Sequence, residues 1–170
     1  MNKLDLTALL ERVRNATGLD RGLDAAMAIG VGYITEYSEP NGQHGSLRGY
    51  EGGVDGKRVS YFAPWWPGDR KWPPSEATVA VNHDIPKFTA SIDAALALVE
   101  RVLPGWAVTV ATYHTDYGSP YADMASRRYI ENDEGFEHEY AESAGLTPVL
   151  AILTALLLAL TSNTEGNDEA

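Results

Sequence analysis

The segment that most constrains the fold of this chain is the apolar run Val149–Leu160, which reads VLAILTALLLAL and is interrupted only by Thr154. The run is too short to cross a bilayer as a helix, because a spanning helix needs about 20 apolar residues. Thr147 and Pro148 directly before it are typical of a helix start, with a capping side chain followed by proline. We therefore predict a buried helix that is apolar all round, covered by its own sheet and neighbouring helices or by another subunit. A homo-oligomer is expected on this ground.

Three further helices are predicted from apolar residues that recur at helical spacing. They are expected over Asp5–Ala16, Arg21–Ile29 and a segment that begins at Thr89 or Ser91 and ends near Leu103. Glycine or Pro-Gly follows each segment and ends it. The buried face of the third helix is expected to consist of Ile92, Ala95, Leu96, Val99 and Leu103.

The residues between 31 and 84 form short runs separated by Gly, Pro and Asn, without a convincing helical pattern. The runs lie at 33–37, 40–45, 47–50, 58–62 and 78–81, with a turn at 51–56 and a loop at 64–74. The alternation in VSYFA (59–63) and ATVAV (77–81) predicts strands or hairpins there. A long irregular segment in a compact domain is usually functional or disordered, and the aromatic content here argues against disorder. Further strands are expected at 106–112, within 117–130 and at 136–140.

Helices at both ends and in the middle, with strands between them, favour an α/β fold in which helices cover a sheet. A single domain is expected over residues 1–162, with residues 31–84 as an aromatic-rich strand and loop insertion. The polar residues 163–170 are expected to form a disordered acidic tail.

Three segments resemble a family of small bacteriophage proteins, the phage ABA-sandwich domain. They read GLDRGLDAAMA (18–28), PKFTASIDAALALVERVLPGW (86–106) and GLTPVLAILTALLLAL (145–160). The resemblance covers the helices and one strand, and it implies a helix–sheet–helix (α-β-α) sandwich and a location in the cytoplasm of a bacterial host. It implies no reaction, because no catalytic residues are attached to these motifs.

Composition limits the classes of partner. The chain holds 24 acidic and 13 basic residues, and residues 131–170 contain nine acids and no Lys or Arg. This balance argues against binding of nucleic acid or an anionic membrane, since Lys and Arg must neutralise phosphates there. The absence of cysteine excludes disulfides, thiolate catalysis and cysteine zinc sites. The N-terminal residues lack the pattern of a secretion signal.

The strongest local candidate for a binding site is the segment Tyr61–Pro74, which reads YFAPWWPGDRKWPP. Aromatic faces beside cations can stack a nucleobase and hold its phosphates. We predict a site for a small anionic, nucleotide-like ligand, to which these residues contribute: Arg48, Tyr50, Arg58, Tyr61, Trp65, Trp66, Arg70, Lys71 and Trp72. The alternatives are that the tryptophans cover the sheet while the cations are solvated, or that the loop contacts a protein.

A second candidate follows the strand expected at 106–112, where the chain reads YHTDY. If the strand continues, His114 and Asp116 share a face and could act as a general base and its orienting group. The alternative is that both are ordinary polar residues of an edge strand. Tyr113 and the pair Arg127 and Arg128 are added to the predicted ligand site, because two arginines can clamp a phosphate. The two arginines could instead balance nearby acids.

No motif of known chemistry is present. The four histidines have no metal-binding spacing, and the chain lacks a nucleophile elbow, a P-loop and a dinucleotide fingerprint, so no metal, cofactor or catalytic residue is expected. The acidic run Glu131–Glu142 could imitate phosphates, contact a basic partner or be a solvated loop.

Three functions follow from these observations. The first is a non-enzymatic phage accessory protein that binds a small anionic nucleotide, and so could sequester a host immune signal. The second is a structural or protein-interaction module that uses the acidic face or the Trp-rich loop. The third is a nucleotide hydrolase that uses His114 with Asp116.

Overall fold

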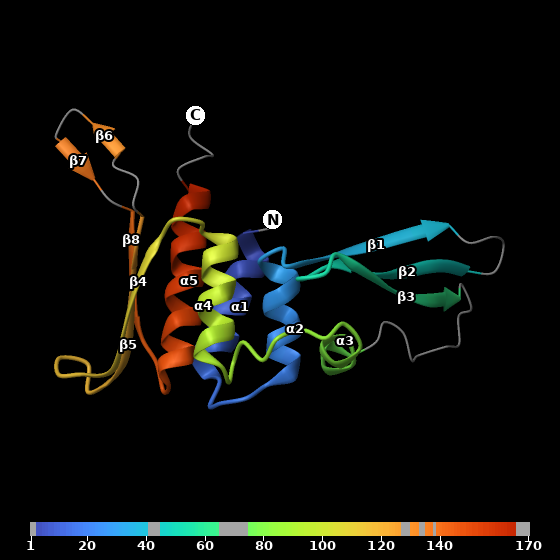
Figure 1. Ribbon diagram of the computed structural model, residues 1–170, viewed down its shortest axis with the longest axis horizontal. Coiled ribbons are helices and arrows are strands. Elements are labelled where there is room, and N and C mark those ends of the chain that lie inside the picture. Colours follow the sequence, from blue (N-terminus) through green and yellow to red (C-terminus); the bar gives the residue numbers. More distant parts are fainter. Residues whose placement is uncertain are drawn as a thin grey trace. The chain divides into compact units, whose positions relative to one another are not determined.

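The computed structural model describes residues 3–40, 45–64, 75–126, 130–132, 135–137 and 139–165. It divides into two compact units, and each is described by itself (Figure 1). Unit 1 consists of Met1–Asp20 and Lys87–Ala170, and unit 2 consists of Arg21–Pro86. The segment expected as an insertion therefore lies within unit 2, together with the second helix of the chain. The single-domain expectation stays a prediction.

Unit 1 contains three described helices and a three-stranded antiparallel sheet in the order β4-β5-β8. The helices are α1 (Lys3–Asn15), α4 (Ile92–Val102) and α5 (Pro148–Glu165), and the strands are β4 (Ala107–His114), β5 (Ser119–Ala125) and β8 (Tyr140–Ala144). Between β5 and β8 the chain forms a separate pair, β6 (Ile130–Asn132) with β7 (Gly135–Glu137). The strands expected from the sequence at 106–112 and within 117–130 are confirmed as β4 and β5.

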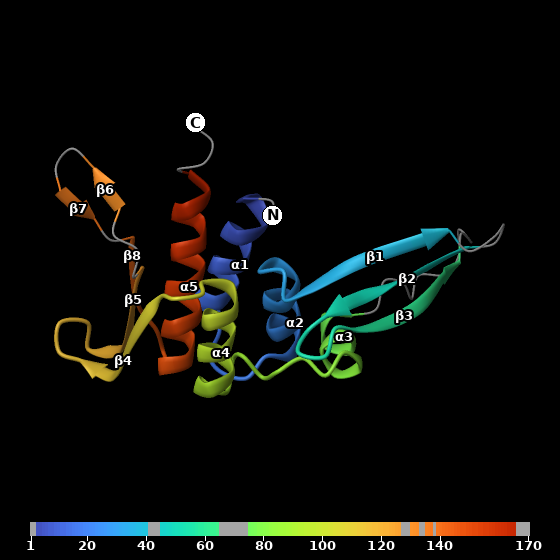
Figure 2. The same cartoon turned by 45° about the horizontal axis from the view of Figure 1, so that its top comes forward.

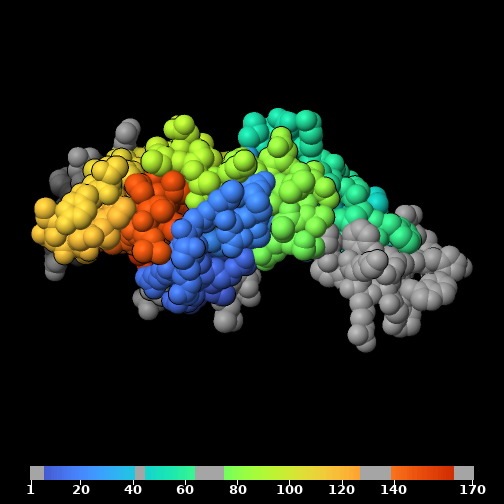
Figure 3. Space-filling model, turned by 90° about the horizontal axis from the view of Figure 1, so that it is seen from below, coloured from blue at the N-terminus to red at the C-terminus, as the bar shows by residue number. Residues whose placement is uncertain are grey.

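Helix α5 is the centre of the unit 1 core. One side packs against the sheet, and the other side packs against α1 and α4 (Figure 2). All residues from Val149 to Leu157 are buried, and the Thr154 hydroxyl donates to the Leu150 carbonyl oxygen at 2.7 Å. On the face that Figure 3 shows, only a small patch of orange-red residues near the start of α5 is visible beside the yellow residues of β4 and β5. The prediction of a buried helix covered by its own chain is confirmed.

The capping predictions at both later helices of unit 1 are confirmed. The Thr147 Oγ1 accepts the Leu150 N–H at 3.2 Å, and the Ser91 Oγ accepts the Ala94 N–H at 3.2 Å. The expected inner face of α4 is only partly right, since Ala95, Leu98 and Val99 are its buried residues. Ile92 is 40% exposed, because it is the first helical residue and has few neighbours to cover it.

Unit 2 contains two described helices and an antiparallel sheet in the order β1-β2-β3. The helices are α2 (Arg21–Gly30) and α3 (Glu76–Asn82), and the strands are β1 (Ile34–Pro40), β2 (Gly45–Gly52) and β3 (Lys57–Pro64). The turn between β2 and β3 places Gly52, Gly53 and Gly56 at positive φ, a conformation that glycine adopts without steric cost. The strand expected from VSYFA is confirmed as β3, and the expected turn is confirmed as well.

The strand expected at residues 77–81 is wrong, because these residues belong to helix α3. Ser75 caps the helix with its Oγ, which accepts the Thr78 N–H at 3.2 Å. The alternation of ATVAV and its β-branched residues suggested a strand. Tertiary packing against α2, which buries Val79 and Ala80, outweighs that local preference.

Arg21 joins α2 to the end of α3. Its guanidinium donates to the buried Asp24 carboxylate at 2.8 Å and to the carbonyl oxygens of Ala80 and Ile85 at 2.9 and 2.6 Å. A helix end leaves carbonyl groups without intrahelical partners, and a guanidinium supplies several donors in a fixed geometry. Together with the packing of Val79 and Ala80, this side chain therefore holds α3 against α2 within unit 2.

Candidate functional site

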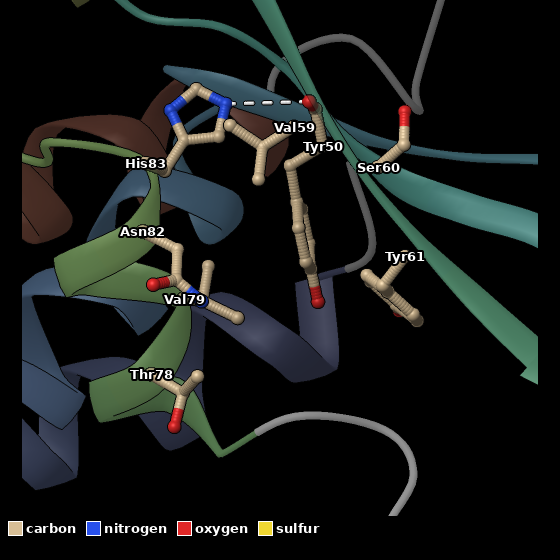
Figure 4. Close-up of a pocket in the computed structure, with 8 residues that line it drawn as sticks. All are labelled: Tyr50, Val59, Ser60, Tyr61, Thr78, Val79, Asn82 and His83. Atoms are coloured by element: carbon tan, nitrogen blue, oxygen red, sulfur yellow. Dashed lines mark hydrogen bonds between the residues drawn. The ribbon is translucent and has the colours of Figure 1, made fainter.

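A pocket of about 100 Å³ lies within unit 2, between helix α3 and one face of strands β2 and β3. The strands and α3 line it from opposite sides (Figure 4). The lining residues are Tyr50, Val59, Ser60, Tyr61, Thr78, Val79, Asn82 and His83. Two of the residues predicted to bind a ligand, Tyr50 and Tyr61, therefore share one cavity.

The register of the sheet explains which side chains meet there. Tyr50 pairs with Val59, and Arg48 pairs with Tyr61. Because side chains alternate between the two faces of a strand, all four share one face of the sheet. The rings of Tyr50 and Tyr61 are tilted by 40° with centroids 6.4 Å apart. Arg48 is exposed beside this pocket and makes no ion pair with another described residue.

Helix α3 and its C-cap residue His83 supply the other wall. The Nε2 of His83 lies 3.3 Å from the Tyr50 carbonyl oxygen (Figure 4). A carbonyl oxygen only accepts, so Nε2 carries a proton and donates to it. Asn82 adds an amide that both donates and accepts. The wall thus offers the Asn82 amide beside the buried Val79, while the His83 ring is engaged with the Tyr50 carbonyl oxygen.

The electrostatics of the pocket favour an uncharged group. Burial, followed by the neighbouring Tyr61 and the Glu36 carboxylate, raises the pKa of Tyr50 to about 12. Burial and then Glu36 also raise the pKa of Tyr61, and Arg48 opposes this shift. Both phenols are therefore neutral hydroxyls near pH 7. Carboxylates that disfavour a phenolate also disfavour a phosphate inside the pocket.

Arg58 was also predicted to contribute to this site, but the structure places it away from the pocket. Its side chain lies on the opposite face of the same sheet, where Nη2 is 2.8 Å from Glu39 Oε1 and Nε is 3.0 Å from Glu51 Oε2. The guanidinium also lies over the Tyr37 ring at 3.8 Å from its centroid. The neighbouring Lys57 pairs with Asp55 at 2.7 Å. Acids of the same strands and turn therefore neutralise both of these cations.

Several predicted residues lie outside the described residues, and their roles stay predictions: Trp65, Trp66, Arg70, Lys71, Trp72, Arg127 and Arg128. The first five belong to residues 65–74, which connect β3 to α3 in the chain. They therefore follow one wall of the pocket and precede the other in sequence. Tyr113 belongs to unit 1, where it is 64% exposed on β4.

The expected pairing of His114 with the Asp116 carboxylate is not formed. The backbone N–H of Asp116 donates to His114 Nδ1 at 3.3 Å, whereas the carboxylate accepts from the Thr115 hydroxyl at 3.3 Å. A carboxylate that orients a histidine base needs a proton on the ring nitrogen facing it. Here Nδ1 is the acceptor, because the turn after β4 directs a backbone amide at it.

A cluster that the sequence analysis missed surrounds Glu142 in unit 1. Its carboxylate accepts hydrogen bonds from the hydroxyls of Tyr117, Tyr121 and Tyr140 at 3.2, 2.7 and 3.0 Å. These bonds, led by the one from Tyr121, lower the pKa of Glu142. Tyr117 also stacks on Tyr121, with centroids 5.2 Å apart. The pairing of β5 with β8 brings Tyr121 close to Glu142. No spacing of residues in the sequence predicts this cluster.

Neither a metal centre nor a membrane span is found in the described part of the chain. No three His, Asp or Glu side chains converge there on a point that could hold a metal ion. None of the described helices combines the length and the hydropathy needed to traverse a bilayer.

Comparison with protein-family models, curated proteins and solved structures gave no significant match. The resemblance to the phage ABA-sandwich family therefore stays a prediction.

Proposed function

We propose that this protein binds a small nucleotide-like ligand without consuming it, and that one edge of the base of the ligand enters the pocket between α3 and strands β2 and β3. The observation that carries this proposal is the placement of two neutral tyrosines opposite Asn82 and His83 in one cavity. Tyrosine faces stack on heteroaromatic rings, and an amide such as that of Asn82 hydrogen-bonds to their edges. A site built in this way recognises a base.

The size and charge of the pocket decide how such a ligand is oriented. A cavity of about 100 Å³ is smaller than the cavity of roughly 150 Å³ that encloses benzene, so it admits one edge of a base and the rest of the ring system stays at its mouth. The phosphates remain outside, where Arg48 is exposed on the same face of the sheet. Arg70 and Lys71, which lie in the connection between the two walls, are further candidates for phosphate contacts.

The wider biological setting is part of the same proposal. We infer from the family resemblance an α-β-α sandwich, a phage origin and a bacterial host cytoplasm as the place of action. A binder of this kind would sequester a signalling nucleotide of the host. The geometry at His114 supports the hydrolase alternative poorly, since the carboxylate of Asp116 does not orient the imidazole.

A capture-and-release assay tests the proposal. The protein is incubated separately with cyclic di-AMP, cyclic di-GMP, ADP-ribose, AMP and adenosine, then filtered and heat-denatured, and both fractions are analysed by liquid chromatography. We expect at least one nucleotide to be retained and to return intact after denaturation. A compound that returns altered would show an enzyme, and passage of every compound into the filtrate would refute the binding site.

Two arginines on opposite faces of one sheet give a matched pair of variants. Arg48→Gln should weaken binding of a retained nucleotide by about tenfold or more, the size expected for a lost charge-assisted hydrogen bond, while adenosine binding is unchanged. Arg58→Gln should leave both affinities as they are, because its side chain points to the other face. Equal effects of the two substitutions would contradict the assignment. Dissociation constants are measured by equilibrium dialysis.

A further inference from the structure

The two three-stranded sheets differ in how their edge strands are protected against pairing with another chain. Edge strands expose unpaired N–H and C=O groups, and charges or prolines on them normally prevent strand addition. In unit 2, β1 carries two glutamates and Pro40, and β3 carries Lys57, Arg58 and Pro64. In unit 1, β8 is only five residues long and includes Glu142. Strand β4 is the exception.

Strand β4 reads AVTVATYH and contains neither Pro nor Asp, Glu, Lys or Arg. It pairs with β5 along one edge, and no described strand lies along its other edge. Pairing with β5 is regular from Ala107 to Ala111 before the register shifts towards His114. Five regular residues of an uncharged edge are therefore available for hydrogen bonding to a further strand.

The side chains of β4 are already sorted into an inner and an outer face. Val108 and Val110 pair with Met124 and Ala122, which are fully buried on the side that α5 covers. Thr109 lies on the opposite, exposed face, where it pairs with Asp123. A strand that joins this edge must present apolar and polar side chains in the same alternation.

We propose that the partner of this edge is the β4 strand of a second copy of the chain, joined antiparallel about a two-fold axis perpendicular to the sheet. Such an axis keeps both copies of α5 on the same side, so the apolar row that holds Val108 and Val110 continues from one copy into the other. The resulting sheet has the order β8-β5-β4-β4-β5-β8. This inference concerns unit 1 and does not depend on the proposed ligand.

Charge and proline are the reasons why β4 pairs with itself and the edge strands of unit 2 do not. Like charges directly opposite one another destabilise a strand pair. Self-pairing of β1 along its length would bring Glu36 opposite Glu39, and self-pairing of β3 along its length would place Pro64, which has no N–H to donate, within the new pair. Self-pairing of β4 brings no charged residue opposite another. The two copies each carry a net charge of −11, so screening by salt should strengthen their association.

Sedimentation velocity across a wide range of protein concentration tests this interface. We expect a monomer–dimer equilibrium that shifts towards the dimer when salt is added. Thr109→Lys should weaken dimerisation by about tenfold or more, because lysine on an edge strand opposes pairing. Thr35→Lys is the matched control, since it places the same substitution at an exposed position of β1. A monomer at every concentration, or a dimer that responds equally to both substitutions, would overturn the proposal.

A second measurement uses the absence of cysteine from the chain. A spin label attached to Thr109→Cys should report a short distance between copies at concentrations where the dimer forms, because position 109 lies close to the proposed two-fold axis. A label attached to Thr35→Cys in unit 2 serves as the comparison. A dimer without short-range dipolar coupling at position 109 would place the interface elsewhere and overturn the proposal.

Discussion

At the scale of single residues, the sheet of unit 2 requires a glycine at one position, Gly49. Tyr37, Gly49 and Ser60 lie side by side on neighbouring strands, and the hydroxyls of Tyr37 and Ser60 are hydrogen-bonded across the glycine. A Cβ at Gly49 would lie 2.8 Å from the Tyr37 hydroxyl and 2.0 Å from the Val59 carbonyl oxygen. Only glycine permits this close approach of the strand backbone and the Tyr37 side chain. The pocket lies on the opposite face of the sheet, which carries Tyr50 and Tyr61.

The protonation of Tyr50 should make the stability of unit 2 depend on alkaline pH. Its pKa is about 12 in the folded chain, against an ordinary value of 10.0. Above pH 10 the unfolded chain loses this proton first, so the free energy of unfolding falls as pH rises towards 12. Tyr50→Phe should reduce that fall by about 2 kcal/mol, since one pKa unit is worth about 1.4 kcal/mol.

Urea denaturation followed at intervals from pH 9 to the alkaline limit measures this effect, and Tyr113→Phe is the control because Tyr113 is largely exposed. The quantity compared is the slope of the free energy of unfolding against pH. An identical slope for Tyr50→Phe and the parent chain would contradict the prediction.

At the scale of elements, helix α3 owes its position in part to one cation in α2. Asp24 is fully buried, and the Arg21 guanidinium that neutralises it also binds the carbonyl oxygens at the end of α3. Since α3 forms one wall of the pocket, the Arg21 contacts connect the stability of unit 2 to the shape of its candidate site.

Removal of this cation should be costly. Arg21→Met removes the ion pair of Arg21 with the buried Asp24 carboxylate and its hydrogen bonds to the carbonyl oxygens of Ala80 and Ile85. We expect a loss of about 3 kcal/mol in the free energy of unfolding. Arg14→Met is the control, because Arg14 and Glu11 form an exposed pair at 3.4 Å, and such pairs contribute at most about 1 kcal/mol. Urea denaturation at neutral pH compares the two variants. Equal losses would show that the Arg21 contacts do not hold α3 in place.

At the scale of the whole molecule, unit 2 occupies a single interruption in the sequence of unit 1. The chain leaves unit 1 after Asp20 and returns at Lys87. These two points are close together, because the Asp20 N–H donates to the Thr89 Oγ1 at 2.9 Å and that hydroxyl donates to the Asp20 carbonyl oxygen at 3.4 Å. A short connection can therefore bridge the gap.

Replacement of residues 21–86 by a short Gly-Ser linker should leave unit 1 folded. The core around α5 is contributed by α1, α4 and the β4-β5-β8 sheet, all of which the deletion retains. We expect helical circular dichroism, a cooperative thermal transition and protected amides in α5 by hydrogen exchange. The parent chain is the reference for α5 protection. Loss of the cooperative transition in the deletion variant would mean that unit 1 requires unit 2.

The sequence predicted the elements whose signals are local. The caps Ser91 and Thr147, the glycine turn between β2 and β3 and the apolar α5 all follow from near neighbours in the chain. A homo-oligomer was expected because α5 is apolar all round. Since α1, α4 and the sheet of unit 1 already cover α5, the argument for an oligomer now depends on the edge of β4. Helix α3 was missed, because its β-branched residues favour a strand until α2 packs against them.

What the sequence alone determined is the set of helices other than α3, the turn between β2 and β3, and the presence of aromatic and charged residues near 48–61. What only the tertiary structure decided is which of them face one another. Arg48 and Arg58 have the same chemistry, yet strand pairing places Arg48 beside Tyr61 on the pocket face. Arg58 lies on the other face, where it forms ion pairs with Glu39 and Glu51. The same is true of the tyrosines around Glu142. Side chains on a strand alternate with a period of two, so register, a long-range property, assigns them to a face.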